Sequence, residues 1–500
     1  NPKNPRNRNS RMSRDSGSFR DPSGYVLQHQ GRIFRALDAG AADLLRELDA
    51  QGHFARWSRE SLMVGTRFVD DPGLLAELFA AHPGFAAFVE HDRIDPITYP
   101  YEWSTSMLAD AGRLTLRLQR ELLPLGLSLK DATAYNVQFV RGRPVFIDLT
   151  SIEKPARLDL WFALGQFNRM FLFPLLLAKH AGWDLRSYFL ANLDGRSTLQ
   201  VGQAFSWFQR WSPKLILDVG LPFALEKKVK AGKASAPRTP VPSAAGAPIG
   251  NPVAQQMTLR RLDKKIAALA ASISPDTVWG DYVQICSYDA AAEASKKSLV
   301  REFLEQVKPA SVLDVGCNTG DYSRIAAECG ASVLATDFDV SAVEQMYRRL
   351  RKEPAAITPM VVDIANPSPG IGYRNAERLP FLGRARPDCV LALAVIHHLL
   401  VGANLPMAAV RDLFASIARK HLVLEFVPTD DVMFRKLIEF RVNLFGDVTL
   451  DRCLDVFSEK FILLRQVPVQ NSPRTLLLLK KRSFPLRPSI DPQLELNQPK

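Results

Sequence analysis

Polar residues that could bind a small molecule recur where apolar segments end in the C-terminal part of the 500-residue chain. The first such segment contains Asp314 and runs into the turn Gly316-Cys-Asn318-Thr-Gly320. Glycines let a backbone approach a ligand where a Cβ would collide, and the helix predicted to follow supplies free N–H donors. The spacing is G-x-x-x-G and differs from the G-x-G-x-x-G of dinucleotide sites, which argues against a pyrophosphate ligand.

Two further apolar segments end in carboxylates. The segment 332–337 ends at Asp337, which is 21 residues after Gly316, and the segment 358–363 ends at Asp363. An acid at the tip of the second strand of a parallel sheet is placed to accept hydrogen bonds from both hydroxyls of a ribose. The position of Asp337 therefore predicts a ligand that carries a ribose.

Two histidines, His397 and His398, follow the fourth apolar segment, 388–396. Imidazole titrates near neutral pH, so either histidine is a candidate general base. Either could equally shape its loop through a hydrogen bond to a backbone carbonyl. Glu425, at the end of the fifth apolar segment, is interpreted as a satisfied structural carboxylate, and Lys296 is placed with Lys297 on a solvated helix face.

The elements that must position these residues are strands and helices that alternate from 308 to about 482. This alternation predicts an α/β fold with a doubly wound parallel sheet. Open sheets of this kind bind ligands at the carboxyl ends of their strands, which is where the carboxylates and histidines collect.

Together these residues resemble the class I S-adenosylmethionine-dependent methyltransferases over about 281–481. The resemblance implies a Rossmann-like seven-stranded sheet, with 461–469 and 474–480 as its terminal hairpin, and S-adenosyl-L-methionine as the cofactor. In this family the first motif surrounds the methionine part of the cofactor, and the acid at the end of the second strand binds the ribose. The acid at the end of the third strand contacts the adenine amino group, and the acceptor binds after the fourth strand. The implied cofactor-binding residues are Asp314, Gly316, Asn318, Gly320, Asp337 and Asp363, and the implied catalytic candidates are His397 and His398. A dehydrogenase or a non-binding Rossmann-like domain is the alternative.

A second motif lies in the N-terminal half, where Asp131 and Asn136 precede an apolar strand that ends at Asp148. It resembles the catalytic and metal-binding loops of the protein kinase and aminoglycoside phosphotransferase superfamily, which implies that Asp131 meets a substrate hydroxyl while the other two residues hold Mg²⁺. Leu129 replaces the usual His, Arg35 stands where a Lys is expected, and no Gly-rich loop precedes. An inactive or rewired kinase-like α+β domain that presents or recognises the acceptor is therefore favoured. Alternatively, Asp131 and Asn136 only brace their own loop.

Composition divides the chain into five parts. We expect a disordered tail at 1–19, the kinase-like domain at 20–225, a Pro/Ala/Lys linker at 226–258, the methyltransferase domain at 259–485 and a second tail at 486–500. Aromatic residues between 203 and 211 have helical spacing, which favours a core position over a nucleic-acid stacking face.

Composition also limits the class of protein. Hydrophobic residues make up 47% of the chain and the formal net charge is +12. Five cysteines without a C-x-x-C pair indicate neither disulfides nor a zinc site, so no metal is predicted. The longest apolar run is too short to span a bilayer and no signal core is present, so we expect a cytoplasmic protein without membrane insertion.

The function predicted from these residues is methyl transfer from S-adenosylmethionine to a hydroxyl or amine of a small or medium-sized metabolite. Two alternatives stay open, which are an ATP- and Mg²⁺-dependent phosphotransferase activity in the N-terminal half and a non-catalytic scaffold. An RNA acceptor is also open because of the positive charge, although no RNA-binding signature is present.

Overall fold

The computed structural model describes residues 12–232, 250–273, 290–439 and 446–483. The chain divides into two compact units. Unit 1 comprises Asn1–Cys286, Cys317–Ala327 and Ser332–Ala385, and unit 2 comprises Ser287–Gly316, Glu328–Ala331 and Arg386–Lys500. The N-terminal half thus shares a unit with part of the C-terminal α/β region, and each unit is described by itself.

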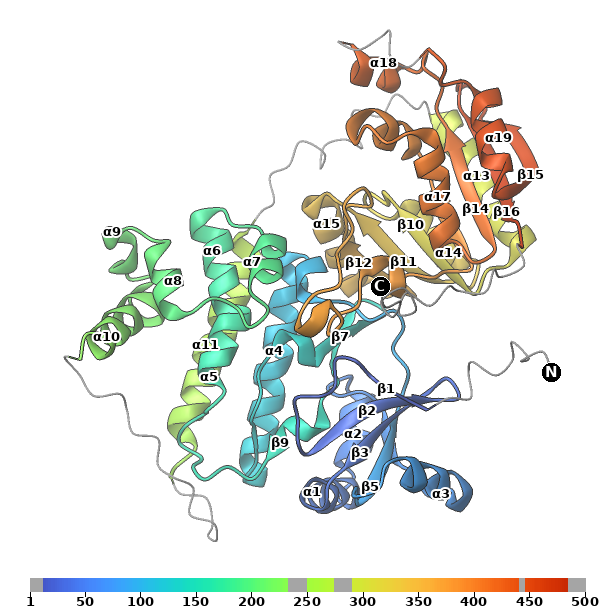
Figure 1. The fold of residues 1–500 in the computed structure, drawn as a ribbon. Helices are drawn as coiled ribbons and strands as arrows, with labels where there is room; N and C mark the ends of the chain where they lie inside the picture. Colours follow the sequence, from blue (N-terminus) through green and yellow to red (C-terminus); the bar gives the residue numbers. More distant parts are fainter. Residues whose placement is uncertain (1–11, 233–249, 274–289, 440–445, 484–500) are drawn as a thin grey trace, which may run out of the picture. The chain divides into compact units, whose positions relative to one another are not determined.

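Unit 1 begins with an antiparallel sheet of order β1-β2-β3-β5-β4 (Figure 1). Strands β2 and β3 form a hairpin, and Gln30 and Gly31 turn it with positive φ values of 51° and 79°. Ser13–Arg14 pair with β2, so this part of the expected tail is a strand. The elements are β1 Ser13–Arg14, β2 Gly24–His29, β3 Arg32–Leu37, α1 Ala39–Ala50, α2 His53–Arg59, β4 Thr66–Phe68, α3 Pro72–Ala81 and β5 Ala87–His91.

The rest of the N-terminal half is mainly helical and surrounds α4, Thr105–Leu122. Helix α11, Val253–Ser272, begins inside the predicted linker and packs against α4 and α6, with an ion pair of 2.8 Å between Arg113 and Asp263. The predicted boundary at 258/259 therefore falls within a helix that packs on the N-terminal half. The remaining elements are η2 Pro100–Glu102, β6 Ser128–Leu129, β7 Val137–Val140, β8 Arg143–Phe146, β9 Ile152–Glu153, α5 Leu164–Phe167, η6 Asn168–Leu172, α6 Phe173–Ala181, α7 Leu185–Ala191, α8 Thr198–Gln203, α9 Trp207–Arg210, η7 Ile216–Gly220 and α10 Leu221–Lys230.

The C-terminal half forms a seven-stranded sheet of order β12-β11-β10-β13-β14-β16-β15. In unit 1, β11 and β12 are parallel; in unit 2, β10, β13 and β14 are parallel and β16 runs antiparallel to β14 and β15. This confirms the predicted Rossmann-like sheet with a terminal hairpin. The strands are β10 Ser311–Val315, β11 Ser332–Asp337, β12 Ile357–Val361, β13 Cys389–Ala392, β14 His421–Phe426, β15 Phe461–Pro468 and β16 Thr475–Lys481.

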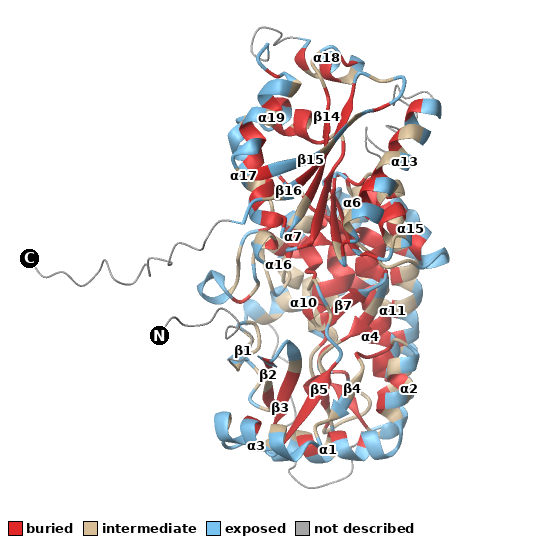
Figure 2. Cartoon of the chain, turned by 90° about the vertical axis from the view of Figure 1, so that its right-hand side faces the viewer, coloured by how far each residue is buried: buried red, intermediate tan, exposed pale blue. Residues whose placement is uncertain are grey.

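The burial of each strand depends on its position in the sheet. Residues of β13 and most of β14 and β16 are buried, whereas β15 at the edge is largely exposed (Figure 2). Among the described residues, no helix is long and apolar enough to span a bilayer. The helices of this half are α13 Ala290–Val307, α14 Asp321–Glu328, α15 Val340–Lys352, α16 Phe381–Arg384, α17 Met407–Ile417, α18 Val432–Ile438 and α19 Leu450–Ser458.

Candidate functional site

In unit 1, the predicted ribose-binding acid holds the glycine turn in place. Asp337 closes β11 and is 8% exposed. Its Oδ2 accepts the N–H of Asn318 at 2.9 Å, and its Oδ1 accepts the N–H of Asp339 at 2.9 Å. Burial raises the pKa of Asp337, and these backbone donors oppose the rise. The structure therefore brings Asp337 and Asn318 together, as the motif predicts.

The turn itself requires unusual backbone angles. Asn318 has φ 49° and Gly320 has φ 88°, both in the left-handed region. A Cβ on Gly320 would lie 2.8 Å from Cε of Met346, the movable end of that side chain, so the positive φ is the stronger reason for glycine here. Asp363 lies beyond the end of β12, is half-buried and accepts the N–H of Ala365 at 2.9 Å, which braces its own turn.

In unit 2, the other part of the first motif lies against the loop that carries the histidines. Asp314 is buried in β10 and pairs with Leu391 of β13. Gly316 follows with φ 67°, and a Cβ there would lie 2.8 Å from Cγ2 of Val395. Ala394, directly before Val395, also has a positive φ, of 55°. Left-handed angles at non-glycine residues store strain and often mark functional loops.

The two histidine rings lie in contact, with ring centroids 4.2 Å apart and ring planes tilted by 36°. His397 is 1% exposed and stacks on Phe434 at 5.9 Å, whereas His398 is half-buried. Burial lowers the pKa of His397 well below its usual value, and the neighbouring His398 and Arg474 add to this effect. Burial, followed by Arg474, also lowers the pKa of His398. Both rings are therefore neutral near pH 7, which is the form that accepts a proton.

A buried charge cluster lies beside these rings in unit 2. Glu425 is fully buried, its Oε2 lies 2.6 Å from Nζ of Lys296, and its Oε1 lies 3.5 Å from Nη1 of Arg474. Arg474 also pairs with Asp431 at 2.8 Å. The prediction that Glu425 is a satisfied carboxylate is confirmed. The solvated position predicted for Lys296 is wrong, because Lys296 is 4% exposed and neutralises this carboxylate.

A cavity of about 270 Å³ adjoins the cluster in unit 2. The sequence does not indicate it, because the residues that form it come from two loops about forty positions apart. The residues that line it are Asp430, Asp431, Val432, Asn471, Ser472, Pro473 and Arg474.

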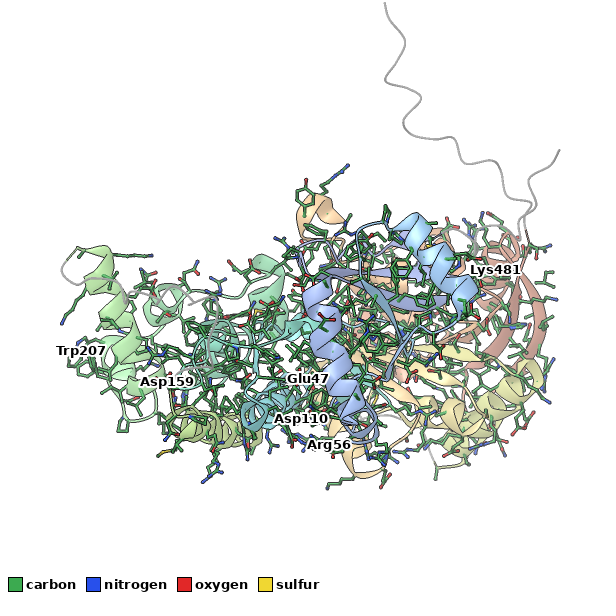
Figure 3. The ribbon with its side chains drawn as sticks, turned by 90° about the horizontal axis from the view of Figure 1, so that it is seen from below. Glu47, Arg56, Asp110, Asp159, Trp207 and Lys481 are labelled. Atoms are coloured by element: carbon green, nitrogen blue, oxygen red, sulfur yellow. The ribbon has the colours of Figure 1, made fainter. Side chains whose placement is uncertain are left out.

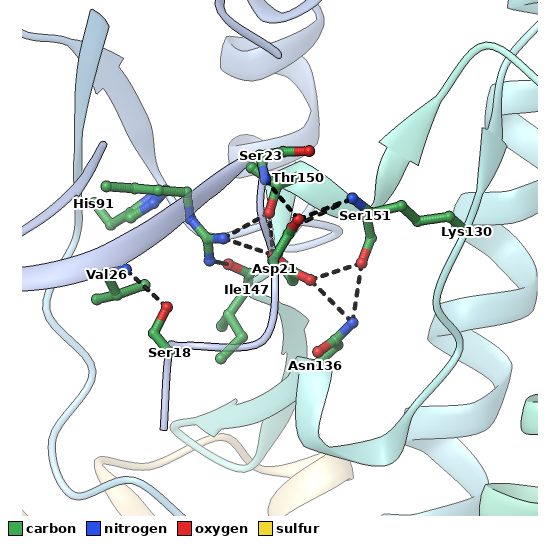
Figure 4. Close-up of polar contacts among 12 residues, drawn as sticks. Ser18, Asp21, Ser23, Val26, His91, Lys130, Asn136, Ile147, Thr150 and Ser151 are labelled. Atoms are coloured by element: carbon green, nitrogen blue, oxygen red, sulfur yellow. Dashed lines mark hydrogen bonds and ion pairs between the residues drawn. The ribbon is translucent and has the colours of Figure 1, made fainter. Parts of the chain in front are cut away.

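The second motif, in the N-terminal half, gathers around Asp148. Figure 4 shows Asn136, Thr150 and Ser151 within this group of polar contacts. Oδ1 of Asp148 accepts from Nη1 of Arg35 at 2.7 Å and from the hydroxyl of Thr150 at 2.9 Å. Its Oδ2 accepts from the hydroxyl of Ser151 at 2.7 Å and from Nδ2 of Asn136 at 3.3 Å. The pKa of Asp148 is lowered because the Arg35 charge and the two hydroxyls outweigh the opposing effect of burial.

Asp131, the remaining residue of this motif, has a raised pKa because of burial, with the Asp148 charge as the next cause. Its neighbour Lys130 pairs with Asp21 at 3.2 Å. Within the parts of the chain that the structure describes, no group of three or more His, Cys, Asp or Glu side chains could hold a metal ion. The structure thus brings Asn136 and Asp148 together and adds Arg35 to them.

Comparison with known proteins agrees with this geometry. The family model described as "Methyltransferase domain" matches residues 288–460. Nodulation protein NoeA of Rhizobium meliloti (strain 1021) is 34% identical over 478 residues, covering 94% of this chain and 97% of NoeA.

Two solved structures are similar at low TM-scores. N-methyltransferase NodS from Bradyrhizobium japonicum WM9 is 15% identical, with 39% of this chain and 99% of NodS covered and a TM-score of 0.30. The bifunctional kinase-methyltransferase WbdD is 16% identical, with 42% of this chain and 43% of WbdD covered and a TM-score of 0.28. Scores of this size support no conclusion about this chain.

The matched region contains the glycine turn, the acid at the end of β11 and the strands β10 to β14 of the seven-stranded sheet. These observations establish an S-adenosylmethionine-dependent methyltransferase. The similarity to NoeA extends over both halves of the chain and nearly the whole length of each protein. The chain therefore belongs to the same protein family as nodulation protein NoeA.

Proposed function

We propose that this methyltransferase acts on a hydroxyl or amine of a small or medium-sized metabolite, and that His398 is the general base. The observation that carries the proposal is the pair of neutral, adjoining histidines in the segment after β13, in which Val395 lies against Gly316.

The residues present fit the cofactor. S-adenosylmethionine supplies a methyl group that is already activated on a sulfonium. The Asp337 carboxylate accepts the backbone N–H groups of Asn318 and Asp339, and a carboxylate oxygen accepts more than one hydrogen bond, so we expect ribose hydroxyls to bind there. The left-handed turn at Gly316, Asn318 and Gly320 keeps side chains away from the approaching ligand. With Asp314 and Asp363, these residues would hold the cofactor.

A base is needed only for some acceptors. A hydroxyl, or an amine that is protonated at neutral pH, must lose a proton before or during attack on a methyl group. His398 is half-buried, whereas His397 is 1% exposed. His397 stacks on Phe434 and lies in contact with His398, so it restrains the orientation of the His398 ring. We therefore assign proton acceptance to His398 and a positioning role to His397.

The cavity beside the charge cluster favours a small polar acceptor. Its volume of about 270 Å³ is at the small end of ligand pockets, and its lining combines acidic, amide, hydroxyl and guanidinium groups. Such a lining suits a metabolite with several polar groups better than a nucleobase or an apolar side chain.

We further propose that the N-terminal half does not hold a magnesium–nucleotide complex. Four donors occupy both oxygens of Asp148, so its lone pairs are used by protein groups and none is left for Mg²⁺. This supports an acceptor-presenting or structural role for the kinase-like part.

Transfer of labelled methyl from S-adenosylmethionine into a host-cell extract, separated into metabolite, RNA and protein fractions, tests the substrate class. Label in the metabolite fraction is expected, whereas label only in RNA or protein would overturn the proposal. His398→Gln should abolish most of the label. His421→Gln is the matched control because His421 begins β14 rather than following a strand, and it should retain activity.

A further inference from the structure

An apolar surface lies at the end of the helical part of the N-terminal half. Trp207 is 60% exposed and Phe208 is 81% exposed, and the exposed large hydrophobic side chains between 207 and 225 also include Trp211, Leu217, Leu221 and Leu225. We name these six residues the apolar tip. They lie on α9, η7 and α10 and on the turn after α9, and Figure 3 shows Trp207 at an outer edge. The predicted core position is therefore wrong for this group, and among these aromatic residues only Phe205 is buried.

The exposure belongs to a well-packed surface rather than a frayed end. Ser206 and Gln209 form a capping box at the start of α9. Nη1 of Arg210 donates to the carbonyl of Gly202 at 2.8 Å, and its guanidinium lies 4.5 Å from the ring centroid of Phe223 on α10. Asp218, on η7, is buried and pairs with Lys265 at 2.5 Å. The apolar tip thus stands on a framework fixed by its own hydrogen bonds and ion pairs.

Positive charge surrounds the apolar tip. Between Trp207 and Lys230, basic residues outnumber acidic ones by five to two. One of the two acidic residues, Asp218, is buried and neutralised by Lys265 and Arg261. The exposed lysines are Lys214, Lys227, Lys228 and Lys230, three of them in the last turn of α10.

We propose that the apolar tip docks the protein on an anionic lipid surface. Tryptophan and phenylalanine partition into the boundary between headgroups and acyl chains, leucines contribute apolar area there, and lysines bind anionic headgroups. Leu217, Leu221 and Leu225 recur at intervals of four along η7 and α10, so they share one side with Lys228. A nucleic acid would use the aromatic rings and the lysines but would gain nothing from this row of leucines.

Vesicle binding of the full chain tests this proposal. Sedimentation would use vesicles of phosphatidylcholine alone and vesicles that also contain phosphatidylglycerol. We expect binding to the anionic vesicles only, and tryptophan quenching by brominated lipid that is lost when Trp207→Ala and Trp211→Ala are combined. Trp207→Ala with Phe208→Ala should weaken binding at least tenfold. Removing the charge of Lys227, Lys228 and Lys230 by substitution with Gln should weaken it about fivefold per lysine.

Matched controls use exposed residues away from the apolar tip. Phe162→Ala removes a side chain that is 47% exposed, and Lys154→Gln removes an exposed charge, so both should bind vesicles as the parent chain does. The proposal fails if the parent chain does not bind anionic vesicles at low salt, or if the controls weaken binding as much as the apolar-tip variants. It also fails if the apolar-tip variants change only dimer formation or single-stranded RNA binding and leave vesicle binding intact.

Discussion

Tyr347 donates its hydroxyl hydrogen to Oδ2 of Asp110, and the two oxygens are 2.8 Å apart. Tyr347 lies on α15, the helix that follows Asp337, while Asp110 lies on α4 of the N-terminal half, and both belong to unit 1. One turn earlier on α4, the N–H of Ser106 donates to Glu344 of α15 at 2.9 Å. Tyr347 and Glu344 are both almost completely buried. The N-terminal half therefore holds a helix of the methyltransferase sheet through a buried polar contact.

Tyr347→Phe should destabilise the protein by about 1–2 kcal/mol, because it removes one hydrogen bond and leaves the Asp110 carboxyl without that donor. The free energy of unfolding of the full chain, measured by urea denaturation, checks this. Tyr373→Phe is the matched control because Tyr373 is 63% exposed, and it should change the free energy by less than about 0.5 kcal/mol. Equal stability of the two variants would contradict a stabilising role for the Tyr347–Asp110 contact.

Asp337→Ala should weaken binding of S-adenosylhomocysteine about 10- to 100-fold, because hydrogen bonds to a charged group contribute about 1.5–3 kcal/mol. Isothermal titration of the full chain measures this. Asp363→Ala should have a smaller effect, because Asp363 is more exposed than Asp337 and water competes for its hydrogen bonds. Asp70→Ala, at an exposed position, is the control for nonspecific effects. Unchanged affinity in Asp337→Ala would remove Asp337 from the cofactor site.

Arg35→Met should destabilise the protein by about 3 kcal/mol at pH 7, because it leaves the Asp148 carboxylate without its counter-charge. A loss of about 3 kcal/mol is the lower end of the range for breaking a buried ion pair, and it is expected here because the Asp148 side chain keeps 20% of its surface exposed. A carboxyl whose pKa is lower in the folded state stabilises the fold at pH values above its unfolded-state pKa. This stabilisation is lost as the pH falls through the folded-state pKa. The difference between parent and variant should therefore shrink below about pH 4.

Urea denaturation of both proteins at pH 7 and at acid pH measures this difference. Arg46→Met is the control, because Arg46 forms an exposed ion pair with Asp43 at 3.6 Å. This substitution should change the free energy of unfolding by less than about 0.5 kcal/mol. Magnesium-dependent ATP binding by the parent chain that disappears in Asp148→Ala would contradict the assignment of Asp148 to a purely protein-bound network.

Local sequence patterns predict much of the seven-stranded sheet. Each strand is a short apolar run with a turn at its end; strand β11 coincides with the predicted segment 332–337, and a helix follows the glycine turn as predicted. The pairing of Asn318 with Asp337 follows from the strand order, because the carboxyl ends of neighbouring parallel strands meet. The kinase-like identity of the N-terminal half stays a prediction.

Contacts between distant residues are what the sequence does not predict. Lys296 has the spacing of a solvated helix face, and its partner Glu425 is 129 residues away, so no local signal shows the buried pair. The aromatic spacing at 207, 208 and 211 is typical of a buried helix face, yet α9 has only four residues and its neighbours leave those rings uncovered. Burial depends on which elements pack nearby, and periodicity alone does not specify that.

The rate of methyl transfer should follow the ionisation of His398. Burial and the Arg474 charge lower the pKa of this histidine below its usual value of about 6.5, so the neutral base form dominates at pH 7. We therefore expect kcat to rise with pH through a midpoint below 6.5 and to be level around pH 7–8. Arg474→Met should shift this midpoint upward because it removes a repelling charge, although it also breaks the pairs with Glu425 and Asp431.

His398→Gln should lower kcat about 100- to 10,000-fold and remove the acid limb of the pH profile, while binding of S-adenosylhomocysteine stays within about threefold of the parent. Retained cofactor binding separates loss of the base from loss of the fold. His421→Gln should keep both the rate and the limb, because His421 begins its strand. A pH profile that is the same in His398→Gln and in the parent would show that another group accepts the proton, or that the acceptor needs no base.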